Sequence, residues 1–177
     1  MTNLRIETLK KKVDAKIKWC REKVLEKYNH AIFPDIRYDL TGTSRTGICK
    51  YKGNIIRLNP HILKEYEDDY INTTVAHEFA HLAVYHILGH RAKPHGREWK
   101  WMMRFLEAPP NRCSDYNMQA IVENTSMKVR RKTARPYLYK CGCTEHRLTS
   151  NIHIKMLKGQ RRSCLKCRQR ITYIGTI

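Results

Sequence analysis

The sequence predicts an α+β protein in two parts: helices packed on a small antiparallel sheet, followed by a β-rich module stabilised by a metal. Three observations on the 177 residues support this fold class. Stretches with apolar residues at helical spacing flank short alternating stretches typical of strands. Two histidines stand four residues apart in an apolar helical run. Two close cysteine pairs lie in a C-terminal segment of about fifty residues, which is too short to build a core alone.

The first part begins with an amphipathic helix and continues with short strands and helices. Apolar residues recur at helical spacing between Ile6 and Tyr28, with lysines between them. Residues 36–40 alternate as a strand does, and residues 48–51 and 54–58 predict a hairpin. Further helices are predicted from Pro60 to residue 66, around the histidine pair, after residue 95, and from a cap at Ser114–Asp115 to residue 123.

The segment V-A-H-E-F-A-H at residues 75–81 is the pattern H-E-x-x-H. Residues four apart share a helix face, so His77 and His81 can present two imidazole nitrogens to one zinc ion. Glu78 then lies where a carboxylate can take a proton from water that attacks a carbonyl. This is the chemistry of peptide hydrolysis by a metalloprotease. The surrounding residues make the helix apolar on most sides, and a buried histidine and glutamate there would need a metal or partners.

A catalytic zinc site needs a third protein ligand, and the candidates downstream are His86, His90, His95 and Glu98. His86 lies nine residues after His77, half a turn out of phase, so it should face away from the metal. His90 follows the glycine that ends the helix, and it stays open as a ligand. We favour His95, because the turn K-P-H-G lets the chain reverse and return a ligand to the metal.

Three blocks of the sequence resemble those of the SprT-like metalloproteases, the group that includes Spartan. They are I-R-L-N-P at 56–60, T-V-A-H-E-F-A-H-L at 74–82 and P-H-G-R-E-W at 94–99, with G-T-S-R-T-G at 42–47 upstream and the paired cysteines downstream. The resemblance extends from about Ile36 to the C-terminus and implies a zincin-like protease domain, which with the N-terminal amphipathic helix is predicted to span residues 1–126. It also implies a catalytic zinc held by His77, His81 and His95, Glu78 as the catalytic residue, and a role in cleaving proteins attached to DNA.

The C-terminal module carries its cysteines as C-x-C, at Cys141 and Cys143, and as C-x-x-C, at Cys164 and Cys167. Two close pairs separated by a β-rich segment are typical of a zinc ribbon, in which a structural ion replaces a core. Cys143 and His146 also have the spacing of a zinc knuckle, so His146 is an alternative ligand. We favour the four cysteines, because thiolates bind structural zinc strongly. Two zinc ions are therefore predicted, one catalytic and one structural.

Positive charge is concentrated in the same module. The chain carries 35 Lys plus Arg against 16 Asp plus Glu, a net charge of +19. Residues 127–177 hold fourteen basic and one acidic side chain, whereas residues 31–126 hold twelve and eleven. Concentration of charge on one module is typical of a surface that binds a polyanion.

We therefore predict that residues 127–136 are a basic connector and that residues 137–177 are a zinc-ribbon subdomain that binds DNA. Binding should be independent of base sequence and weaken steeply with salt, and single-stranded or distorted DNA is the expected partner, because tyrosines in the module can stack on unpaired bases. The predicted DNA contacts are Arg130, Arg131, Lys132, Arg135, Lys155, Lys158, Arg161, Arg162, Arg168 and Arg170.

Together these features predict a zinc endopeptidase that acts on DNA-associated proteins, including proteins crosslinked to DNA. No apolar run has the length of a membrane helix and the first residues form no secretory signal, so we expect a cytoplasmic, nucleoid-associated protein without a membrane partner. Two alternatives stay open. One is a zinc peptidase unrelated to DNA whose tail binds a partner protein. The other is a non-catalytic, zinc-containing DNA-binding or transcription-associated protein whose H-E-x-x-H site is structural.

Overall fold

The computed structural model describes residues 2–125 and 134–177. The chain separates into two compact units, Met1–Arg130 and Arg131–Ile177. The predicted connector, residues 127–136, lies mostly outside the described residues. No helix in the described ranges combines the length and the apolar character that crossing a membrane requires.

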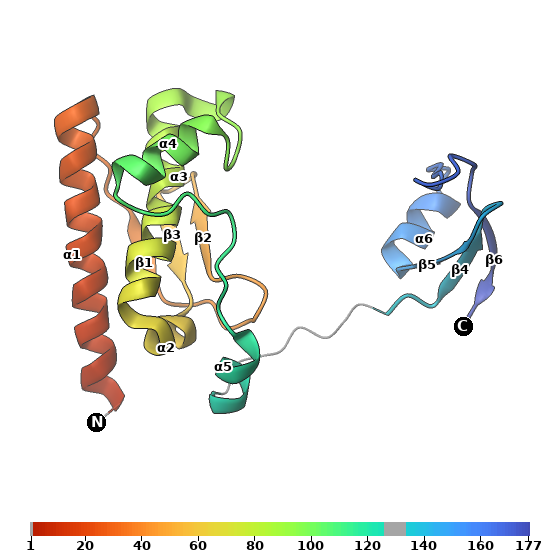
Figure 1. The fold of residues 1–177 in the computed structure, drawn as a ribbon, viewed down its shortest axis with the longest axis horizontal. Coiled ribbons are helices and arrows are strands. Elements are labelled where there is room, and N and C mark those ends of the chain that lie inside the picture. The colour runs from red at the N-terminus through yellow and green to blue at the C-terminus, as the bar shows by residue number, and fades with distance from the viewer. Residues whose placement is uncertain (1, 126–133) are drawn as a thin grey trace. The chain divides into compact units, whose positions relative to one another are not determined.

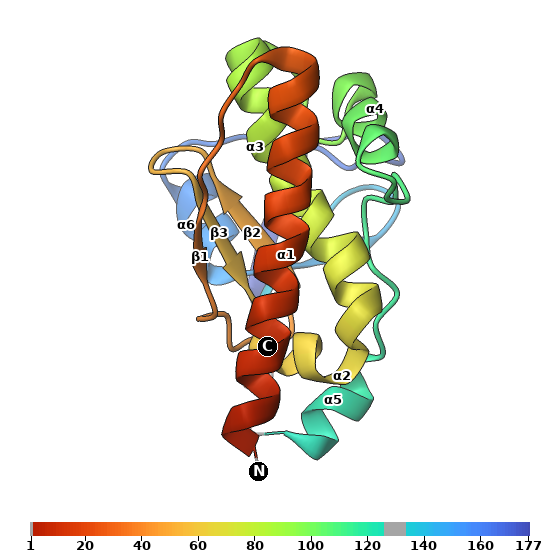
Figure 2. The same ribbon diagram turned by 90° about the vertical axis from the view of Figure 1, so that its left-hand side faces the viewer.

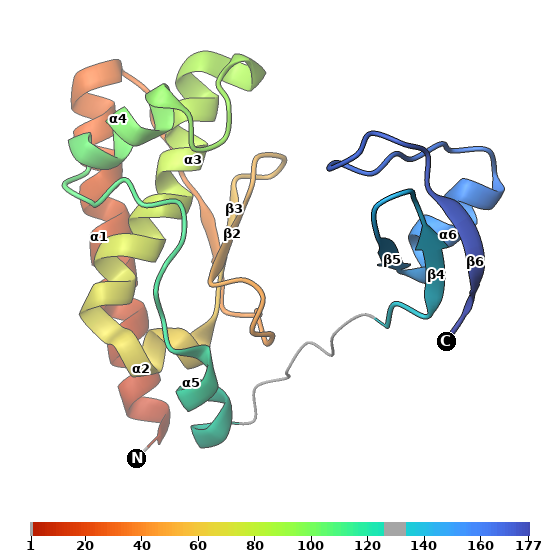
Figure 3. The same ribbon diagram turned by 45° about the vertical axis from the view of Figure 1, so that its right-hand side comes forward.

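The first unit contains a long helix, a three-stranded sheet and a run of further helices (Figure 1). Its strands are β1 (Asp35–Arg37), β2 (Gly47–Lys50) and β3 (Ile55–Leu58). Its helices are α1 (Thr2–Tyr28), α2 (Pro60–Tyr70), a π-helical segment (Ile71–Val75), α3 (Ala76–Leu88), a 3-10 segment (Gly89–Arg91), α4 (Arg97–Phe105) and α5 (Met118–Asn124). Helix α3 contacts both α1 and β2, and so lies between the long helix and the sheet (Figure 3).

Helix α1 is amphipathic, as its spacing predicts, and runs along the unit in front of α3 in the view of Figure 2. Its buried side chains are Leu9, Val13, Ile17, Cys20 and Val24. Several lysines of the outer face are paired with carboxylates of the same unit. Lys12 bonds Asp68 at 2.9 Å, for example, and Lys23 bonds Glu107. Part of the positive charge of α1 is therefore neutralised within the unit.

The sheet has the order β1-β3-β2 and is mixed. Strands β2 and β3 form the predicted antiparallel hairpin, with Cys49 opposite Ile56. Strand β1 instead pairs with β3 in parallel, with Ile36 opposite Ile56. The prediction of an antiparallel sheet is thus wrong for this pair. Residues 38–46 connect β1 to β2, which lies at the opposite edge of the sheet. The β2–β3 hairpin then reverses the chain, so β3 lies between the two strands and runs parallel to β1.

Helix α3, which carries the histidine pair, continues directly from α2 through the π-helical segment, so no loop separates the two helices. Asn59 caps α2, its Oδ1 accepting from the backbone N–H of His61 at 3.1 Å, and Pro60 occupies the first turn. The backbone is irregular at Glu67, where φ is 30°, yet the helical path continues through the π-helical segment into α3. Single π-helical turns often occur at functional sites, and this one ends two residues before His77.

The second unit is a small sheet with one helix. Its elements are β4 (Tyr137–Lys140), β5 (Glu145–Leu148), α6 (Ser150–Leu157) and β6 (Thr172–Thr176), and the antiparallel strand order is β5-β4-β6. Helix α6 corrects the prediction of a segment that is only β-rich. The buried cluster contains just Tyr139, Cys141, Cys164 and Ile171. So small a core cannot hold the unit together alone, which fits a unit stabilised by a metal.

Candidate metal centre and active site

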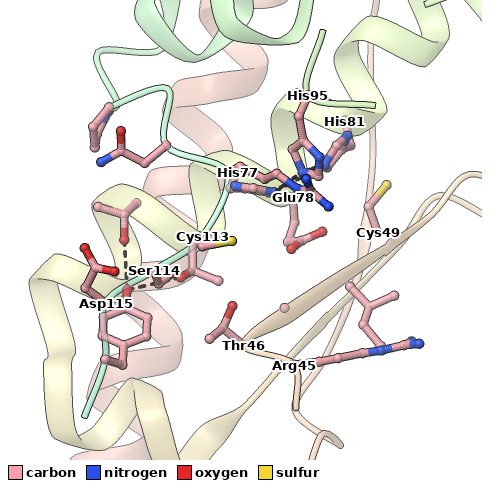
Figure 4. A pocket seen from close by; sticks show the side chains of 18 of the residues that line it. Arg45, Thr46, Cys49, His77, Glu78, His81, His95, Cys113, Ser114 and Asp115 are labelled. Atoms are coloured by element: carbon pink, nitrogen blue, oxygen red, sulfur yellow. Dashed lines mark hydrogen bonds between the residues drawn. The ribbon is translucent and has the colours of Figure 1, made fainter. Parts of the chain in front are cut away.

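Three imidazoles from two separate segments converge in the first unit (Figure 4). His77 and His81 stand one turn apart on α3, and His95 lies in the turn before α4. Their Nε2 atoms are 3.0, 3.1 and 3.2 Å from one another. Zinc bound by imidazoles at about 2.0–2.1 Å in tetrahedral geometry requires nitrogens about 3.3–3.4 Å apart. The three histidines, called the triad below, therefore fit a zinc ion with only a slight expansion.

The backbone conformation of His95 brings its side chain back to α3. This residue has a φ of 58°, the left-handed conformation that non-glycine residues adopt uncommonly. The N–H of Gly96 donates to the carbonyl of Lys93 at 2.9 Å and closes the turn. A side chain at position 96 would lie 2.9 Å from that same carbonyl oxygen. The K-P-H-G sequence thus forms a tight reversal that delivers the third imidazole.

Burial keeps the triad neutral, which is the form that binds a metal. It lowers the pKa of His77 to about 4, lowers that of His81 to about 3, and lowers that of His95 as well. A hydrogen bond to the backbone of Asn111 acts in the opposite direction on His77. Because Nε2 of His77 faces the other two rings, this bond engages the other ring nitrogen and leaves Nε2 free as a ligand.

Glu78 is the buried acid of the site. It follows His77 on α3, is 7% exposed, and points its carboxyl group toward β2 (Figure 4). Burial raises its pKa to about 8, and a hydrogen bond to the backbone of Cys49 partly offsets that effect. A carboxyl group with a pKa near neutrality can accept and return a proton at physiological pH. A divalent cation in the triad would lower this pKa and favour the carboxylate, the form that acts as a base.

Strand β2 has room for Glu78 because residue 47 is glycine. A Cβ atom at Gly47 would lie 2.7 Å from both Cγ and Oε1 of Glu78. The acid therefore packs directly against the backbone of β2. The sequence shows Gly47 only as the last residue of the G-T-S-R-T-G loop, so its contact with the acid could not be foreseen.

We expect Gly47→Ala to lower kcat roughly tenfold to a hundredfold, because the added methyl group displaces the Glu78 carboxylate by part of an ångström and misplacements of that size are costly in catalysis. Zinc content should not change, since the triad lies on other elements. Peptide hydrolysis and zinc analysis measure the two effects. The control is Lys50→Ala, at the exposed end of the same strand, which should keep the wild-type kcat. Unchanged kcat in Gly47→Ala would show that the acid needs no such close packing.

The triad and Glu78 open into a cleft of about 1220 Å³. Strand β2, the loop of residues 43–46 and the segment between α4 and α5 line this cleft. Within the described residues, β2 is an edge strand that pairs with β3 alone. An unpaired strand edge beside a cleft can bind an extended peptide through its backbone.

Trp99 packs against all three histidines. Its ring centroid is 4.6 Å from that of His77, 4.8 Å from that of His95 and 5.6 Å from that of His81. The side chain comes from α4 and is 1% exposed. Helical spacing indicates only that Trp99 faces the core, so sequence reasoning misses this contact with the triad.

The other candidate ligands lie apart from the triad. Nε2 of His86 is 2.9 Å from Oδ1 of Asn54, consistent with its expected orientation away from the metal. His90 packs edge-on against Tyr85. Glu98 sits in the first turn of α4. None of the three belongs to the group of His77, His81 and His95 that the described residues bring within ligand distance.

The second unit brings together the sulfur atoms of Cys141, Cys143, Cys164 and Cys167, all within 4.8 Å of one another. The Sγ atoms of Cys141 and Cys143 are 3.5 Å apart, and those of Cys143 and Cys164 are 3.7 Å apart. Tetrahedral zinc with Zn–S bonds of about 2.3 Å requires about 3.8 Å. His146 approaches from outside, with Nε2 at 3.2 Å from Cys141 Sγ. It is therefore placed to hydrogen-bond a ligand sulfur beside the four-cysteine set.

The predicted DNA-binding residues that the structure describes are all exposed. They are Arg135, Lys155, Lys158, Arg161, Arg162, Arg168 and Arg170. None of these seven forms an ion pair with a described carboxylate. The other three, Arg130, Arg131 and Lys132, lie outside the described residues.

Comparisons with known proteins point to one family. The family model described as SprT-like matches residues 17–122, which hold the triad and Glu78. Protein SprT of Pseudomonas fluorescens is 34% identical over 145 residues, covering 80% of this chain and 81% of that protein. Protein SprT of Pseudomonas paraeruginosa is 33% identical over 148 residues, covering 81% and 82%. No solved structure gives a significant match. The chain therefore belongs to the SprT-like family.

Proposed function

We propose that this protein is a zinc-dependent endopeptidase that cleaves proteins bound or crosslinked to DNA. The observation that carries the proposal is the meeting of three neutral imidazoles and a buried acid in one open cleft. Membership of the SprT-like family supports a metalloprotease role in general. The DNA part of the proposal rests on the charge and the exposed side chains of the second unit.

The hydrolytic chemistry follows from the positions of the residues in the cleft. A zinc ion held by His77, His81 and His95 would supply Lewis acidity to the reacting groups. Glu78 takes a proton from the water molecule that attacks the peptide carbonyl and passes it to the departing amine. Burial raises the pKa of Glu78 and a bound cation would lower it again, and these opposing effects suit a group that first takes a proton and then returns it.

The substrate chain is expected to bind as an extended strand along β2. Gly47, Ile48 and Cys49 line the cleft, and their strand is paired on one side only within the described residues. Pairing of this kind holds a peptide mainly through its backbone, so it imposes little side-chain preference. Recruitment to DNA, rather than a shaped pocket, would then select which proteins are cut.

The second unit supplies that recruitment in our proposal. Residues 134–177 hold ten basic and one acidic side chain. Tyr173 is 47% exposed and its ring lies 5.3 Å from Tyr139 and 5.0 Å from His153, which forms an aromatic face within this basic unit. Basic side chains contact phosphates without reading sequence, and an exposed aromatic ring can stack on an unpaired base.

The test compares cleavage of a DNA-binding protein with and without single-stranded DNA at two salt concentrations. We expect DNA to stimulate cleavage at low salt and the stimulation to disappear at high salt. With four to seven phosphate contacts, affinity should fall roughly 50- to 1000-fold between about 50 and 200 mM salt. The double variant Arg161→Glu/Arg162→Glu should bind DNA weakly and lose the stimulation. Lys11→Glu/Lys27→Glu, an equal charge change at exposed positions of α1, is the matched control.

Two outcomes would contradict the proposal. Equal, salt-independent cleavage of free and DNA-bound proteins would favour a peptidase whose tail binds another partner. DNA binding without any cleavage, in protein that carries zinc at the triad, would favour a non-catalytic DNA-binding protein.

A further inference from the structure

We propose that Trp99 is a positioning residue that sets the ring orientations of the zinc-binding triad. The proposal rests on the function proposed above, because it concerns the same metal site. In this proposal, packing against the Trp99 indole orients the histidine rings, whereas hydrogen bonds usually orient them at metal sites. Histidines that bind a metal almost always donate their second ring N–H to a neighbouring group, which fixes the tautomer and the ring plane.

That usual arrangement holds for only one of the three histidines. His77 has the backbone of Asn111 as its partner. The imidazole rings of His81 and His95 form no hydrogen bond with the described residues other than the contacts of their Nε2 atoms within the triad. Among the described residues, packing is therefore the contact available to orient the other two rings.

Trp99 is the side chain that provides this packing. Its ring stacks on His81 at an interplanar angle of 28° and meets His95 edge-on at 82° and His77 at 62°. The three imidazoles thus contact one rigid plane, and each is held at a different angle. A tryptophan has only two side-chain torsions, so it can constrain its neighbours at a low entropic cost.

Three features hold the indole itself in place. The side chain is 1% exposed, so the surrounding core restricts its rotation. Its Nε1 lies 3.4 Å from the carbonyl oxygen of His77, in reach of a long hydrogen bond to α3. It also lies four residues after His95, in the first turn of α4, so one short segment supplies both the third ligand and the residue that packs on the triad.

The same helix offers a matched control. Trp101 is 43% exposed, and its ring contacts those of Tyr28 and Phe105 instead of the triad. A substitution at Trp101 removes an indole from α4 without touching the metal site. Trp99→Met keeps a flexible apolar side chain but removes the flat face, and Trp99→Phe leaves a smaller ring.

The experiment measures the zinc retained by the full chain as a chelator is titrated, with the four-cysteine site as the internal reference. Trp99→Met should lower the zinc affinity of the triad about 10- to 100-fold, the usual effect of losing an outer support of a metal ligand. Trp99→Phe should show a smaller loss, and Trp101→Met none. Circular dichroism checks the fold of each variant. A folded Trp99→Met that holds triad zinc like wild type overturns the proposal. If that variant does not fold, unchanged affinity in Trp99→Phe overturns it.

A second readout separates this proposal from the proposed function. The only tryptophans are Trp19, Trp99 and Trp101, so Trp19→Phe/Trp101→Phe leaves Trp99 as the sole reporter. Cobalt(II) bound at the triad should quench its fluorescence, and a further His95→Ala change should abolish the quenching. Absence of quenching in the parent would mean that the triad binds no metal, which rejects the proposed function. Quenching together with wild-type zinc affinity in Trp99→Met would reject only the role of Trp99.

Discussion

Glu78→Gln should abolish most of the proposed peptide hydrolysis and leave the proposed zinc and DNA binding unchanged. The amide keeps the size of the side chain against Gly47 but cannot take a proton from water. General acid–base catalysis contributes typically 10²- to 10⁴-fold, so a loss of roughly that size is expected in kcat. Peptide cleavage, zinc analysis and a DNA-binding titration measure the three properties on the same preparation. Cleavage at the wild-type rate would show that another residue is the base.

The free energy of unfolding of metal-free Glu78→Gln shows whether this variant is correctly folded. In the wild type, burial raises the pKa of Glu78 from its ordinary 4.5 to about 8. A carboxyl group with a raised folded-state pKa favours the fold while it is protonated, and that contribution is lost as pH rises from about 4.5 through about 8. Glutamine cannot ionise, so metal-free Glu78→Gln should be more stable than wild type by on the order of 5 kcal/mol above pH 8. The difference should vanish below about pH 4.5, and denaturant titrations at several pH values measure it.

The sequence alone predicts correctly the two ligands of the site that lie on one helix. His77 and His81 share a face because the helical repeat places residues four apart together, and α3 does present both. The turn at K-P-H-G indicated a reversal, yet the left-handed backbone at His95 that brings its ring to the others is a local conformation that sequence spacing does not specify. The third ligand therefore rested on the resemblance as much as on the residues.

Contacts between distant segments could not be predicted in the same way. Gly47 lies against Glu78, Asn111 bonds His77, and Trp99 packs on the triad only after the chain has folded. Each of these contacts joins helix α3 to a strand, a loop or another helix that follows or precedes it by about twenty residues or more. Periodicity reports only which side of an element is apolar.

Two local predictions fail for identifiable reasons. Ser114–Asp115 resembles a helix cap, but α5 begins at Met118 and Asn117 caps it by accepting from the N–H of Ala120 at 3.2 Å. The segment between the two cysteine pairs is predicted to be β-rich, yet its residues Ser150–Leu157 form α6. In short elements, tertiary packing overrides weak local preferences.

Cys164→Ser should unfold the second unit and leave the first unit active. Cys164 is 4% exposed and is one of only four buried residues in that core, so the unit has little besides a metal to stabilise it. Structural zinc contributes about 10–16 kcal/mol of apparent binding free energy in small domains, far more than such a core can replace. The variant should bind one zinc ion in place of two and lose at least tenfold in DNA affinity, while its kcat on a short peptide is unchanged.

The control for this variant is Cys113→Ser, at an exposed cysteine outside the four-sulfur group, which should keep both zinc ions and the DNA affinity of the wild type. Limited proteolysis reports the folding of the second unit directly, since an unfolded unit is cut quickly. If Cys164→Ser retains two zinc ions, His146 is the residue positioned to replace the lost sulfur, because its Nε2 is already 3.2 Å from Cys141 Sγ. A further His146→Ala change would then release the second ion. That result would show that five residues can bind the structural ion and that His146 replaces a cysteine when one is lost.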